Sequence, residues 1–554
     1  MRHWDVMFET ARGDLASWRG AFPTDPYETD RPLRSLLAGA LPADRRTALE
    51  PVARAFGRNV VEVVAPCAQR YEHRAHLPEL TRYDAAGRRV EQITFDPDYH
   101  TAGAVVWGSG LVAHSAQPGR AFEQATLLYL LSLEGEAGHA CPAVCTIGLA
   151  RALRRAASDE IRDRFLPGLV RTDYRTAERA SQFLTEVQGG SDVGANATIA
   201  EPRADGSYAL RGEKWFCSVA DAEQFLVTAR VPGAPAGTRG LGCFVMPRLL
   251  DGAPNGFALR RLKEKLGTRG MASGEMDLDG ATAWPVGPVE HGFRTAVGVV
   301  LNTSRWMTAV GATGMMRRAY LEASAYARHR RAFGARIDEF PAVRAILAQL
   351  RVSWTGALHL VFALTALEDR IDAGTADEEA ALYHRFLVNA AKYACSVDAT
   401  GAVRQGIEVL GGNGTIEEFS VLPRLYRDSI VYESWEGTHN VLVAQILADL
   451  RRLPVLDVVA GRLGQLCRSA GSAAGAQARA QLDRGLEEAR RAMEDPDHGA
   501  RFFRHTLDRL MTVARVAYLL DAGEELAAEH LLAAPLRDPD AAMAARVDAL
   551  AQGE

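Results

Sequence analysis

Glu436 is the acidic residue whose neighbours best fit proton-transfer chemistry. It stands in Trp435-Glu-Gly-Thr-His-Asn440, between an aromatic residue and a glycine. A carboxylate with such neighbours can be held in a water-poor pocket, where it can act as a general base. The pattern also fits a carboxylate retained only for structure. We therefore treat Glu436 as a candidate base.

Two segments have the composition of a surface for a flat ligand. One is Leu184-Thr-Glu-Val-Gln-Gly-Gly-Ser-Asp-Val-Gly194, where adjacent glycines let a ligand approach the backbone and Thr185 and Ser191 offer hydroxyls. The other is Gly212-Glu-Lys-Trp-Phe-Cys-Ser-Val219, which offers two aromatic rings and the hydroxyl of Ser218. Taken singly, the first also fits a glycine-rich turn and the second the aromatic core of a β-sandwich.

Two further segments suit phosphate groups. His329-Arg-Arg-Ala-Phe-Gly334 places paired arginines beside a glycine near the end of a predicted helix, which suits a pyrophosphate. A solvated helix C-terminus is an equally good alternative. Gly406-Ile-Glu-Val-Leu-Gly-Gly-Asn-Gly414 follows a helical pattern, so its glycines form either a helix C-cap or a backbone surface for phosphate.

The elements that must position these segments follow from the periodicity of the apolar residues. Residues 1 to about 35, rich in proline and mixed charge, are expected to form an irregular arm, and helical spacing dominates from about 45 to 178. Short β-forming runs separated by turn residues then predict strands at 208–211, 224–230, 241–247 and 274–279.

Helical patterns return after Gly292 and predict a bundle, with long helices at 300–331, 341–369 and 378–410. The chain is therefore mainly α with a central small β domain. We divide it into an N-terminal arm and helical domain (1–180), a β domain (181–288), a C-terminal four-helix-bundle domain (289–450) and an additional helical extension (451–554).

Composition argues against several classes. The net charge of −5 gives no overall attraction to nucleic acid or to an anionic membrane. The longest stretch without Asp, Glu, Lys or Arg, from Tyr99 to Gly119, is too polar for a membrane span. The seven cysteines are scattered, which argues against a disulfide framework. Cys141 and Cys145 are interpreted as small buried residues, and no metal site is predicted.

The start of the chain lacks the apolar core of a signal peptide, so a cytoplasmic location is expected. Lysine is scarce, and we interpret this scarcity as codon bias. The chain has only four lysines, Lys214, Lys263, Lys265 and Lys392.

The segments above, in this order, resemble the acyl-CoA dehydrogenase superfamily. Its pattern is a Thr-Glu/Gly/Ser-Asp loop, a Gly-x-Lys-aromatic strand, an Arg-x-x-Phe-Gly helix end, a Leu-Gly-Gly-x-Gly turn and an aromatic-Glu-Gly-Thr/Ser segment, all present between about 180 and 442. Other segments resemble the AidB-like branch, and with the C-terminal extension the likeness covers most of the chain. They are Leu80–Arg89, Phe95–His100, Glu136–Pro142, Glu264–Arg269 and Leu422–Arg427.

The resemblance implies the family's fold: a helical N-terminal domain, a β-barrel or sandwich, and a C-terminal helical bundle. It implies FAD as cofactor, held in part by a neighbouring subunit, and hence a homo-oligomer, either a tetramer or a dimer. Ser218 stands where the family's flavin-N5 donor sits. The family's tryptophan aligns with Phe216, one place after Trp215. The alignment therefore does not decide which of these two rings stacks on the flavin. The implied FAD contacts are Leu184, Thr185, Gly190, Ser191, Phe216, Ser218, Arg330, Phe333, Gly411, Gly412, Thr438 and Asn440.

The reaction implied is α,β-dehydrogenation of an acyl thioester, with Glu436 removing the α-proton and flavin N5 accepting the β-hydride. The Glu436 main-chain N–H would help to stabilise the developing enolate. Relatives that place the base on another helix have it at the position of Ser304, which carries no carboxylate. The positions implied to contact substrate are Ser191, Arg305, Trp435 and Gly437. An electron acceptor is also required.

Three alternatives remain. An AidB-like protein can bind DNA in the alkylation response, but residues 451–554 hold 14 Lys plus Arg against 16 Asp plus Glu, without the usual basic footprint. A flavin oxidase or monooxygenase can use the same fold, since fold does not fix reaction. A protein that binds FAD without turnover would keep Glu436 only for structure.

Overall fold

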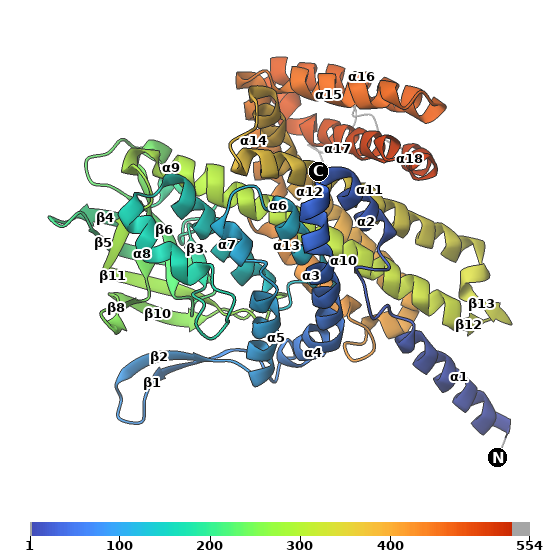
Figure 1. Cartoon of the computed structure of the whole chain (residues 1–554), viewed down its shortest axis with the longest axis horizontal. Coiled ribbons are helices and arrows are strands. Elements are labelled where there is room, and N and C mark those ends of the chain that lie inside the picture. The colour runs from blue at the N-terminus through green and yellow to red at the C-terminus, as the bar shows by residue number, and fades with distance from the viewer. Residues whose placement is uncertain (1–2, 534–554) are drawn as a thin grey trace, which may run out of the picture.

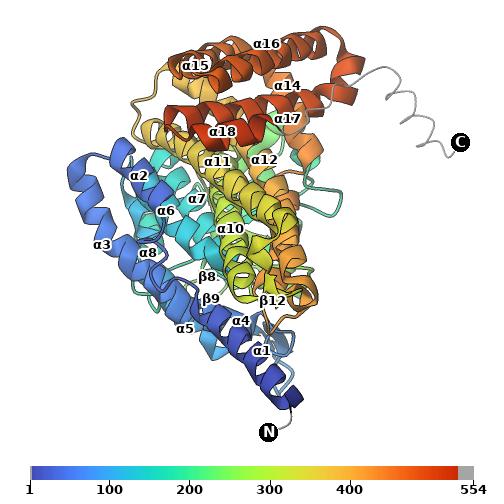
Figure 2. The ribbon, with the colours of Figure 1, turned by 90° about the vertical axis from the view of Figure 1, so that its right-hand side faces the viewer.

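The computed structural model describes residues 3–533. A β domain lies to one side of a central block of long helices, and the last helices form a separate layer across that block (Figure 1). Turning the molecule by 90° shows the first helices along one edge of the block (Figure 2). The architecture is the expected one, mainly helical with one small β domain in the middle of the chain.

The chain is helical from its first described residues, so the irregular arm expected over residues 1 to about 35 is wrong. α1 (His3–Gly20) and α2 (Arg31–Ala40) occupy most of this segment. Two prolines that suggested an arm lie where helices tolerate them. Pro26 falls between the two helices, and Pro32 lies in the first turn of α2, where a backbone N–H has no partner within the helix.

A β-hairpin interrupts the helices of the N-terminal part, and the periodicity does not predict it. Most side chains of its strands are exposed, so no alternation of apolar and polar residues marks it. Leu80 and Ile93 pack against the core of the β domain, which shows that tertiary contact stabilises the hairpin. The elements of this part are α3 (Ala43–Asn59), α4 (Ala65–Tyr71), β1 (Glu79–Tyr83), β2 (Arg89–Thr94), α5 (Pro97–Gly108), α6 (Ala121–Leu131), α7 (Ala140–Ala156) and α8 (Asp159–Leu169).

The β domain is a small closed barrel. Strands β5, β4, β6, β7 and β11 pair in a circuit that returns to β5, while β3 adds to β6 and β10 to β11. The four predicted strands are confirmed as parts of β5, β6, β7 and β11. The strands are β3 (Ala180–Phe183), β4 (Ile199–Pro202), β5 (Tyr208–Ser218), β6 (Gln224–Arg230), β7 (Leu241–Pro247), β8 (Leu249–Leu250), β9 (Ala253–Pro254), β10 (Phe257–Leu262) and β11 (Ser273–Pro285).

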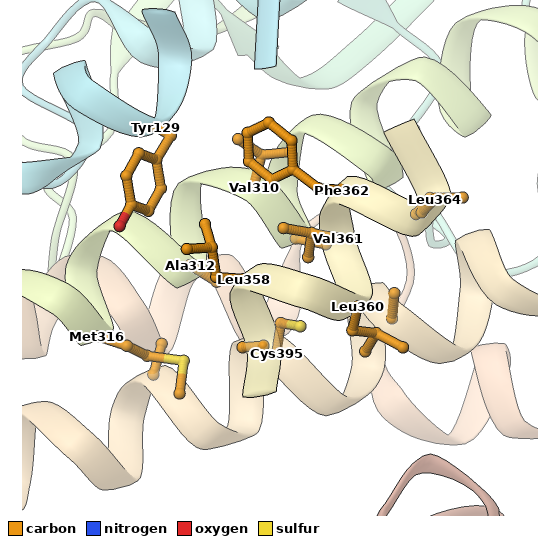
Figure 3. Close-up of a cluster of buried hydrophobic side chains, with 14 of the residues drawn as sticks. Tyr129, Val310, Ala312, Met316, Leu358, Leu360, Val361, Phe362, Leu364 and Cys395 are labelled. Carbon is orange, nitrogen blue, oxygen red and sulfur yellow. The ribbon is translucent and has the colours of Figure 1, made fainter. Parts of the chain in front are cut away.

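Three long helices form the centre of the molecule. Side chains from α10, α11 and α12, together with Tyr129 of α6, gather into a continuous apolar core (Figure 3). α11 is long and apolar enough to cross a membrane, but most of its apolar stretch is buried inside the protein. The elements after the barrel are α9 (Gly292–Thr295), α10 (Asn302–His329), β12 (Arg331–Ala332), β13 (Ala335–Arg336), α11 (Pro341–Asp372), α12 (Glu378–Leu410), α13 (Leu422–Ser434) and α14 (His439–Arg452).

The predicted C-terminal extension is helical as far as the structure describes it, and residues 534–554 lie outside the described residues. Its longest helix, α17, packs on α11, α12 and α14 of the bundle (Figure 2). The extension is therefore a separate layer that packs directly against the bundle. Its helices are α15 (Val455–Ser469), α16 (Ala473–Glu494), α17 (Pro496–Asp521) and α18 (Glu525–Leu532).

Three of the segments that carry the AidB-like resemblance meet at one buried junction. Asp428, just after Leu422–Arg427, accepts hydrogen bonds from the backbone N–H of Thr268 at 2.7 Å and of Glu136 at 3.2 Å. These contacts join α13, the β domain and the N-terminal helices. Burial raises the pKa of Glu136 to about 8. The junction thus fixes three parts of the chain against one another.

Candidate active site

The candidate base lies in the loop that joins α13 to α14. Trp435 packs its ring edge-on against Tyr432, with 4.4 Å between ring centroids. Glu436 has a φ of 57° and Gly437 a φ of 106°, so two successive residues adopt left-handed backbone. Such a conformation costs a non-glycine residue about 1 kcal/mol or more and persists only where the surroundings impose it. The loop must therefore be held by its neighbours.

Two buried cations hold the loop through its carbonyl groups. Arg305 of α10 donates from Nε to the Glu436 carbonyl oxygen at 3.0 Å. Lys392 of α12 donates to the carbonyl oxygens of Glu433 and Gly437, each at 3.0 Å. Both cationic side chains are almost fully buried. The loop and the last turn of α13 are thus attached to two core helices at three carbonyl groups, which accounts for the unusual backbone of the loop.

Arg305, expected among the substrate contacts, is engaged by the protein itself. Its Nη1 donates to Asn389 at 2.7 Å and to Gln445 at 3.1 Å, in addition to the bond to Glu436. Ser304 beside it is buried and lies 3.4 Å from the Gln182 side chain on β3. Two adjacent residues of α10 thus contact the base loop and the strand that precedes the glycine-rich loop.

The electrostatics of the site suit a base at neutral pH. Burial raises the pKa of Glu436 to about 7, against the opposing effect of Arg305 and Lys392. Burial also lowers the pKa of Lys392 to about 7 and that of Arg305 to about 10. A carboxyl group with a pKa near 7 is ionised in part at neutral pH and still basic enough to accept a proton.

Cys141 on α7 also faces this region. Its Sγ lies 3.8 Å from that of Cys145, and its pKa is raised well above the usual value by Cys145, by burial and by nearby carboxylates that include Glu436. Both thiols are largely withdrawn from solvent, as expected for small buried residues. Among residues 3–533, no three His, Cys, Asp or Glu side chains are grouped to hold a metal ion.

The glycine-rich loop and the aromatic strand form one unit. The Trp215 N–H donates to the Thr185 carbonyl oxygen at 2.9 Å. Lys214 and Glu186 form a fully buried ion pair at 2.7 Å, and Glu186 also accepts from two backbone N–H groups of the following segment. Leu184 is buried beneath this unit, whereas Gly190 and Ser191 are exposed at its surface. The Thr-Glu and Gly-x-Lys motifs therefore depend on each other physically.

The two aromatic residues of β5 differ in exposure. Lys263 lies over the Trp215 ring at 3.6 Å from the centroid, so that ring is partly covered. Phe216 is 52% exposed, although Lys263 also approaches its ring at 4.8 Å. Phe216 and Ser218 flank the buried Cys217 and so point to the opposite face of the strand. Of the two aromatic rings, that of Phe216 is the one exposed on this face and able to contact a flat ligand.

A second group of predicted contacts lies far from the base. Arg330 and Phe333 follow the end of α10, and Gly411 and Gly412 follow the end of α12. Asn413 bonds to Tyr326 at 3.2 Å, which joins the two helix ends. From Arg305 to Arg330 the helix rises about 37 Å at 1.5 Å per residue. Within one chain, this group is therefore well separated from Glu436.

The residues near the base retain open polar groups that a flavin dinucleotide can use. Trp435 Nε1 and His439 Nδ1 are buried and have no hydrogen-bond partner among residues 3–533. Thr438 is exposed at the start of α14 and does not cap that helix with its side chain. In the distant group at the ends of α10 and α12, an added Cβ at Gly411 or Gly412 would meet no atom within 4 Å, so a ligand can approach the backbone there. These features fit FAD.

Sequence reasoning missed Lys392 and the partner of Lys214. The scarcity of lysine could have indicated them. Each of the four lysines in this arginine-rich chain has a defined partner in the structure. Lys263 pairs with Glu275 at 2.7 Å, and Lys265 donates to the Met271 carbonyl oxygen at 2.7 Å. Codon bias alone does not explain why the remaining lysines stand at such positions.

Family models match three consecutive parts of the chain. Residues 21–176 match the adaptive response protein AidB N-terminal domain, residues 181–281 the acyl-CoA dehydrogenase middle domain, and residues 290–450 the acyl-CoA dehydrogenase C-terminal domain. Together these matches cover most of the chain up to the extension.

Similar proteins agree with these matches. AidB of Escherichia coli is 34% identical over 387 residues, 68% of this chain and 69% of AidB. Acyl-CoA dehydrogenase family member 11 of Caenorhabditis elegans is 31% identical over 442 residues, 76% and 70% of the two chains. The crystal structure of C. elegans ACDH-11 in complex with C11-CoA superposes with a TM-score of 0.88 at 26% identity, covering 95% of this chain and 94% of that one.

A structure from Bacillus anthracis, an acyl-CoA dehydrogenase complexed with FAD, shares the fold with a TM-score of 0.70 at 19% identity, covering 91% of each chain. The cofactor is FAD, and the activity is that of an oxidoreductase acting on CH–CH bonds of acyl-CoA compounds. The chain belongs to the acyl-CoA dehydrogenase family, in its AidB-like branch.

Proposed function

We propose that the protein catalyses α,β-dehydrogenation of an acyl thioester and that Glu436 is the base that removes the α-proton. The observation that carries this proposal is the state of Glu436: a carboxyl group with a pKa of about 7, on a loop fixed by Arg305 and Lys392. A fixed carboxylate that is half ionised near pH 7 is what abstraction of a weakly acidic proton requires.

In the proposed reaction the α and β C–H bonds break and a C=C bond forms. Glu436 takes the α-proton on its carboxylate. When bound, FAD supplies the two-electron acceptor, with flavin N5 taking the β-hydride. The developing negative charge on the thioester oxygen needs a hydrogen-bond donor. The Glu436 main-chain N–H makes no hydrogen bond within residues 3–533 and is available for this role.

The alternative location for a base carries no carboxylate. Ser304 stands there, buried and in contact with Gln182. A serine hydroxyl has no tendency to accept a proton at neutral pH unless another base activates it. This supports the assignment of the proton-transfer role to Glu436. Trp435 and Gly437, on either side of it, shape the space in which the thioester would bind.

Two copies of the chain would complete one cofactor site. The flavin end would lie against Thr185, Phe216 and Ser218 of one subunit, beside Thr438 and Asn440. The group at Arg330, Phe333, Gly411 and Gly412, about 37 Å along α10 from the base, would hold the rest of an FAD that belongs to a neighbour. We accordingly propose a homo-oligomer, either a dimer or a tetramer, in the cytoplasm.

Product analysis tests the reaction class. Purified holoenzyme is incubated with saturated acyl-CoAs of increasing chain length and an artificial electron acceptor, and the thioesters are analysed by mass spectrometry. Dehydrogenation predicts a product lighter by two hydrogens, with no peroxide formed. A hydroxylated product would instead identify a monooxygenase, and peroxide in stoichiometric amount an oxidase. An unchanged panel would exclude simple acyl-CoA thioesters as substrates.

A further inference from the structure

The C-terminal extension reaches the base loop through two adjacent residues of α12. Lys392 donates to the carbonyl oxygens of Glu433, in the last turn of α13, and of Gly437 in the loop. Tyr393 is the next residue, so its side chain leaves the helix about 100° further round. It faces α17 of the extension and is almost fully buried. One short stretch of α12 therefore lies between the loop and the extension.

On the extension side, α17 holds the Tyr393 hydroxyl from two directions. The hydroxyl donates to Asp508 Oδ1 at 2.6 Å and accepts from Arg504 Nε at 3.0 Å. The Arg504 guanidinium also lies over the Tyr393 ring, 5.4 Å from its centroid. About two turns beyond Asp508, Arg515 of α17 pairs with Asp398 of α12. These charged contacts fix the position of Tyr393 relative to α17.

On the loop side, the Tyr393 ring contacts the residue that ends the loop. It packs edge-on against His439, with 5.2 Å between centroids and an angle of 75° between planes. His439 Nε2 bonds to Glu433 Oε2 at 2.7 Å, and the carbonyl oxygen of Glu433 accepts from Lys392. The residues on both sides of Glu436 are thus joined to each other and to Lys392 and Tyr393.

We propose that α17 of the extension is a positioning element for catalysis: Asp508 and Arg504 fix Tyr393, and Tyr393 with Lys392 fixes the loop that carries Glu436. The inference rests on the proposed role of Glu436 as base. The left-handed backbone at Glu436 persists only if its surroundings impose it. In this proposal the extension belongs to those surroundings and so acts on the base of its own subunit.

A second hydrogen bond between the same two helices provides a matched control. Tyr383 of α12 and Tyr518 of α17 share a bond of 3.0 Å between their hydroxyl groups, and both are buried. In the part of the chain that the structure describes, neither tyrosine makes a hydrogen bond or ring contact with the residues from Glu433 to His439. Tyr518→Phe therefore removes an equivalent α12–α17 bond without touching the base loop.

The test compares Tyr393→Phe and Asp508→Ala with Tyr518→Phe in the FAD-loaded enzyme. Hydrogen exchange is followed in peptides that span 430–442, with melting temperature and flavin content measured alongside. We expect all three variants to melt somewhat lower, but only Tyr393→Phe and Asp508→Ala to exchange faster in the loop. With an acyl-CoA that reduces the flavin, the limiting rate should fall on the order of tenfold in these two, because small misplacement of a reacting group is costly.

Equal loop exchange in all the variants and the wild type would overturn the proposal, whatever the melting temperatures. Glu436→Gln separates this failure from failure of the proposed function. If Glu436→Gln still reduces the flavin at the wild-type rate, Glu436 is not the base. If Glu436→Gln is inactive, but Tyr393→Phe and Tyr518→Phe have equal rates of flavin reduction and equal hydrogen exchange in the loop, only the proposed role of α17 is wrong.

Discussion

Lys392 shows how a single residue type can mark a site. Arginine supplies nearly all the positive charge of this chain, yet a lysine stands beneath the base loop, where its compact ammonium group reaches two carbonyl groups at once. The planar fork of an arginine does not reproduce that geometry. The charge also acts on Glu436, whose carboxylate is stabilised by Arg305 and Lys392 against the effect of burial.

This predicts a specific pH dependence at the residue scale. The rate of flavin reduction should rise with pH with a midpoint near 7, because Glu436 accepts a proton only when ionised. Lys392→Met should move the midpoint to higher pH, since loss of a nearby positive charge raises the carboxyl pKa. Lys392→Arg, which keeps the charge, should shift it less. Stopped-flow absorbance across pH measures this, and an unmoved or lower midpoint in Lys392→Met would contradict it.

At the scale of elements, the buried pair between Lys214 and Glu186 supports the flavin loop. The pKa of Glu186 is lowered to about 2: burial raises it, but Lys214 and backbone N–H donors outweigh burial. Because the folded pKa lies below the ordinary value near 4.5, the stabilisation is present above that pH and is lost as pH falls toward 2. The loop should therefore be held firmly at neutral pH.

Lys214→Met should destabilise the protein by about 3–5 kcal/mol, because it leaves the Glu186 carboxylate buried without its cation. The ratio of bound flavin to protein should also be lower in Lys214→Met than in the wild type. Lys263→Met serves as the matched control for the melting temperature, since Lys263 follows β10 of the same sheet directly and its side chain retains some exposure. Thermal melts and flavin-to-protein ratios provide the comparison, and the deficit should narrow below pH 4.5. Equal melting temperatures for the two variants would refute this role of the pair.

The sequence predicts the elements whose periodicity is strong and misses those that depend on tertiary contact. Four strands of the β domain, β5, β6, β7 and β11, and the long helices α10, α11 and α12 follow from apolar spacing and turn residues, whereas β3, β4 and β10 are not predicted. The hairpin of β1 and β2 does not, because its strands are mostly exposed and only Leu80 and Ile93 pack inward. α1 is not predicted because prolines follow it in the sequence. Those prolines lie between α1 and α2 and in the first turn of α2.

The candidate site shows the same division. Glu436 and the glycine-rich loop stand out through local motifs. The contribution of Lys392 is not visible locally, because it reaches the loop from a residue more than forty positions earlier. The Tyr393 contacts with α17 span more than one hundred positions. Sequence alone gives no way to place such partners together, although the scarcity of lysine singles out one of them.

At the scale of the whole molecule, the hairpin of β12 and β13 has the features of a surface that contacts another subunit. Phe333 is 99% exposed at its tip and has a φ of 51°. A bulky aromatic residue rarely adopts this backbone, and the two-residue turn that it forms with Gly334 favours asparagine at this position. A side chain that is unfavourable in the turn and fully exposed is consistent with a contact made in the assembly.

Phe333→Asn tests this because it should suit the turn better while removing the ring. We expect the variant to form smaller assemblies and to retain less FAD than the wild type. Leu526→Asn is the control, since Leu526 is 82% exposed on α18, away from the hairpin. Light scattering coupled to size exclusion, with flavin absorbance, gives both quantities. Wild-type mass and flavin content in Phe333→Asn would argue against a shared site.

The central claim is that Glu436 removes the α-proton, and anaerobic reduction of the bound flavin tests it most directly. FAD-loaded wild type and Glu436→Gln are mixed with an acyl-CoA, and the loss of flavin absorbance is followed. We predict rapid bleaching of the wild type and a rate at least a thousandfold lower, on the order of 4 kcal/mol in barrier, for Glu436→Gln with FAD still bound. Bleaching of Glu436→Gln at the wild-type rate would contradict the account.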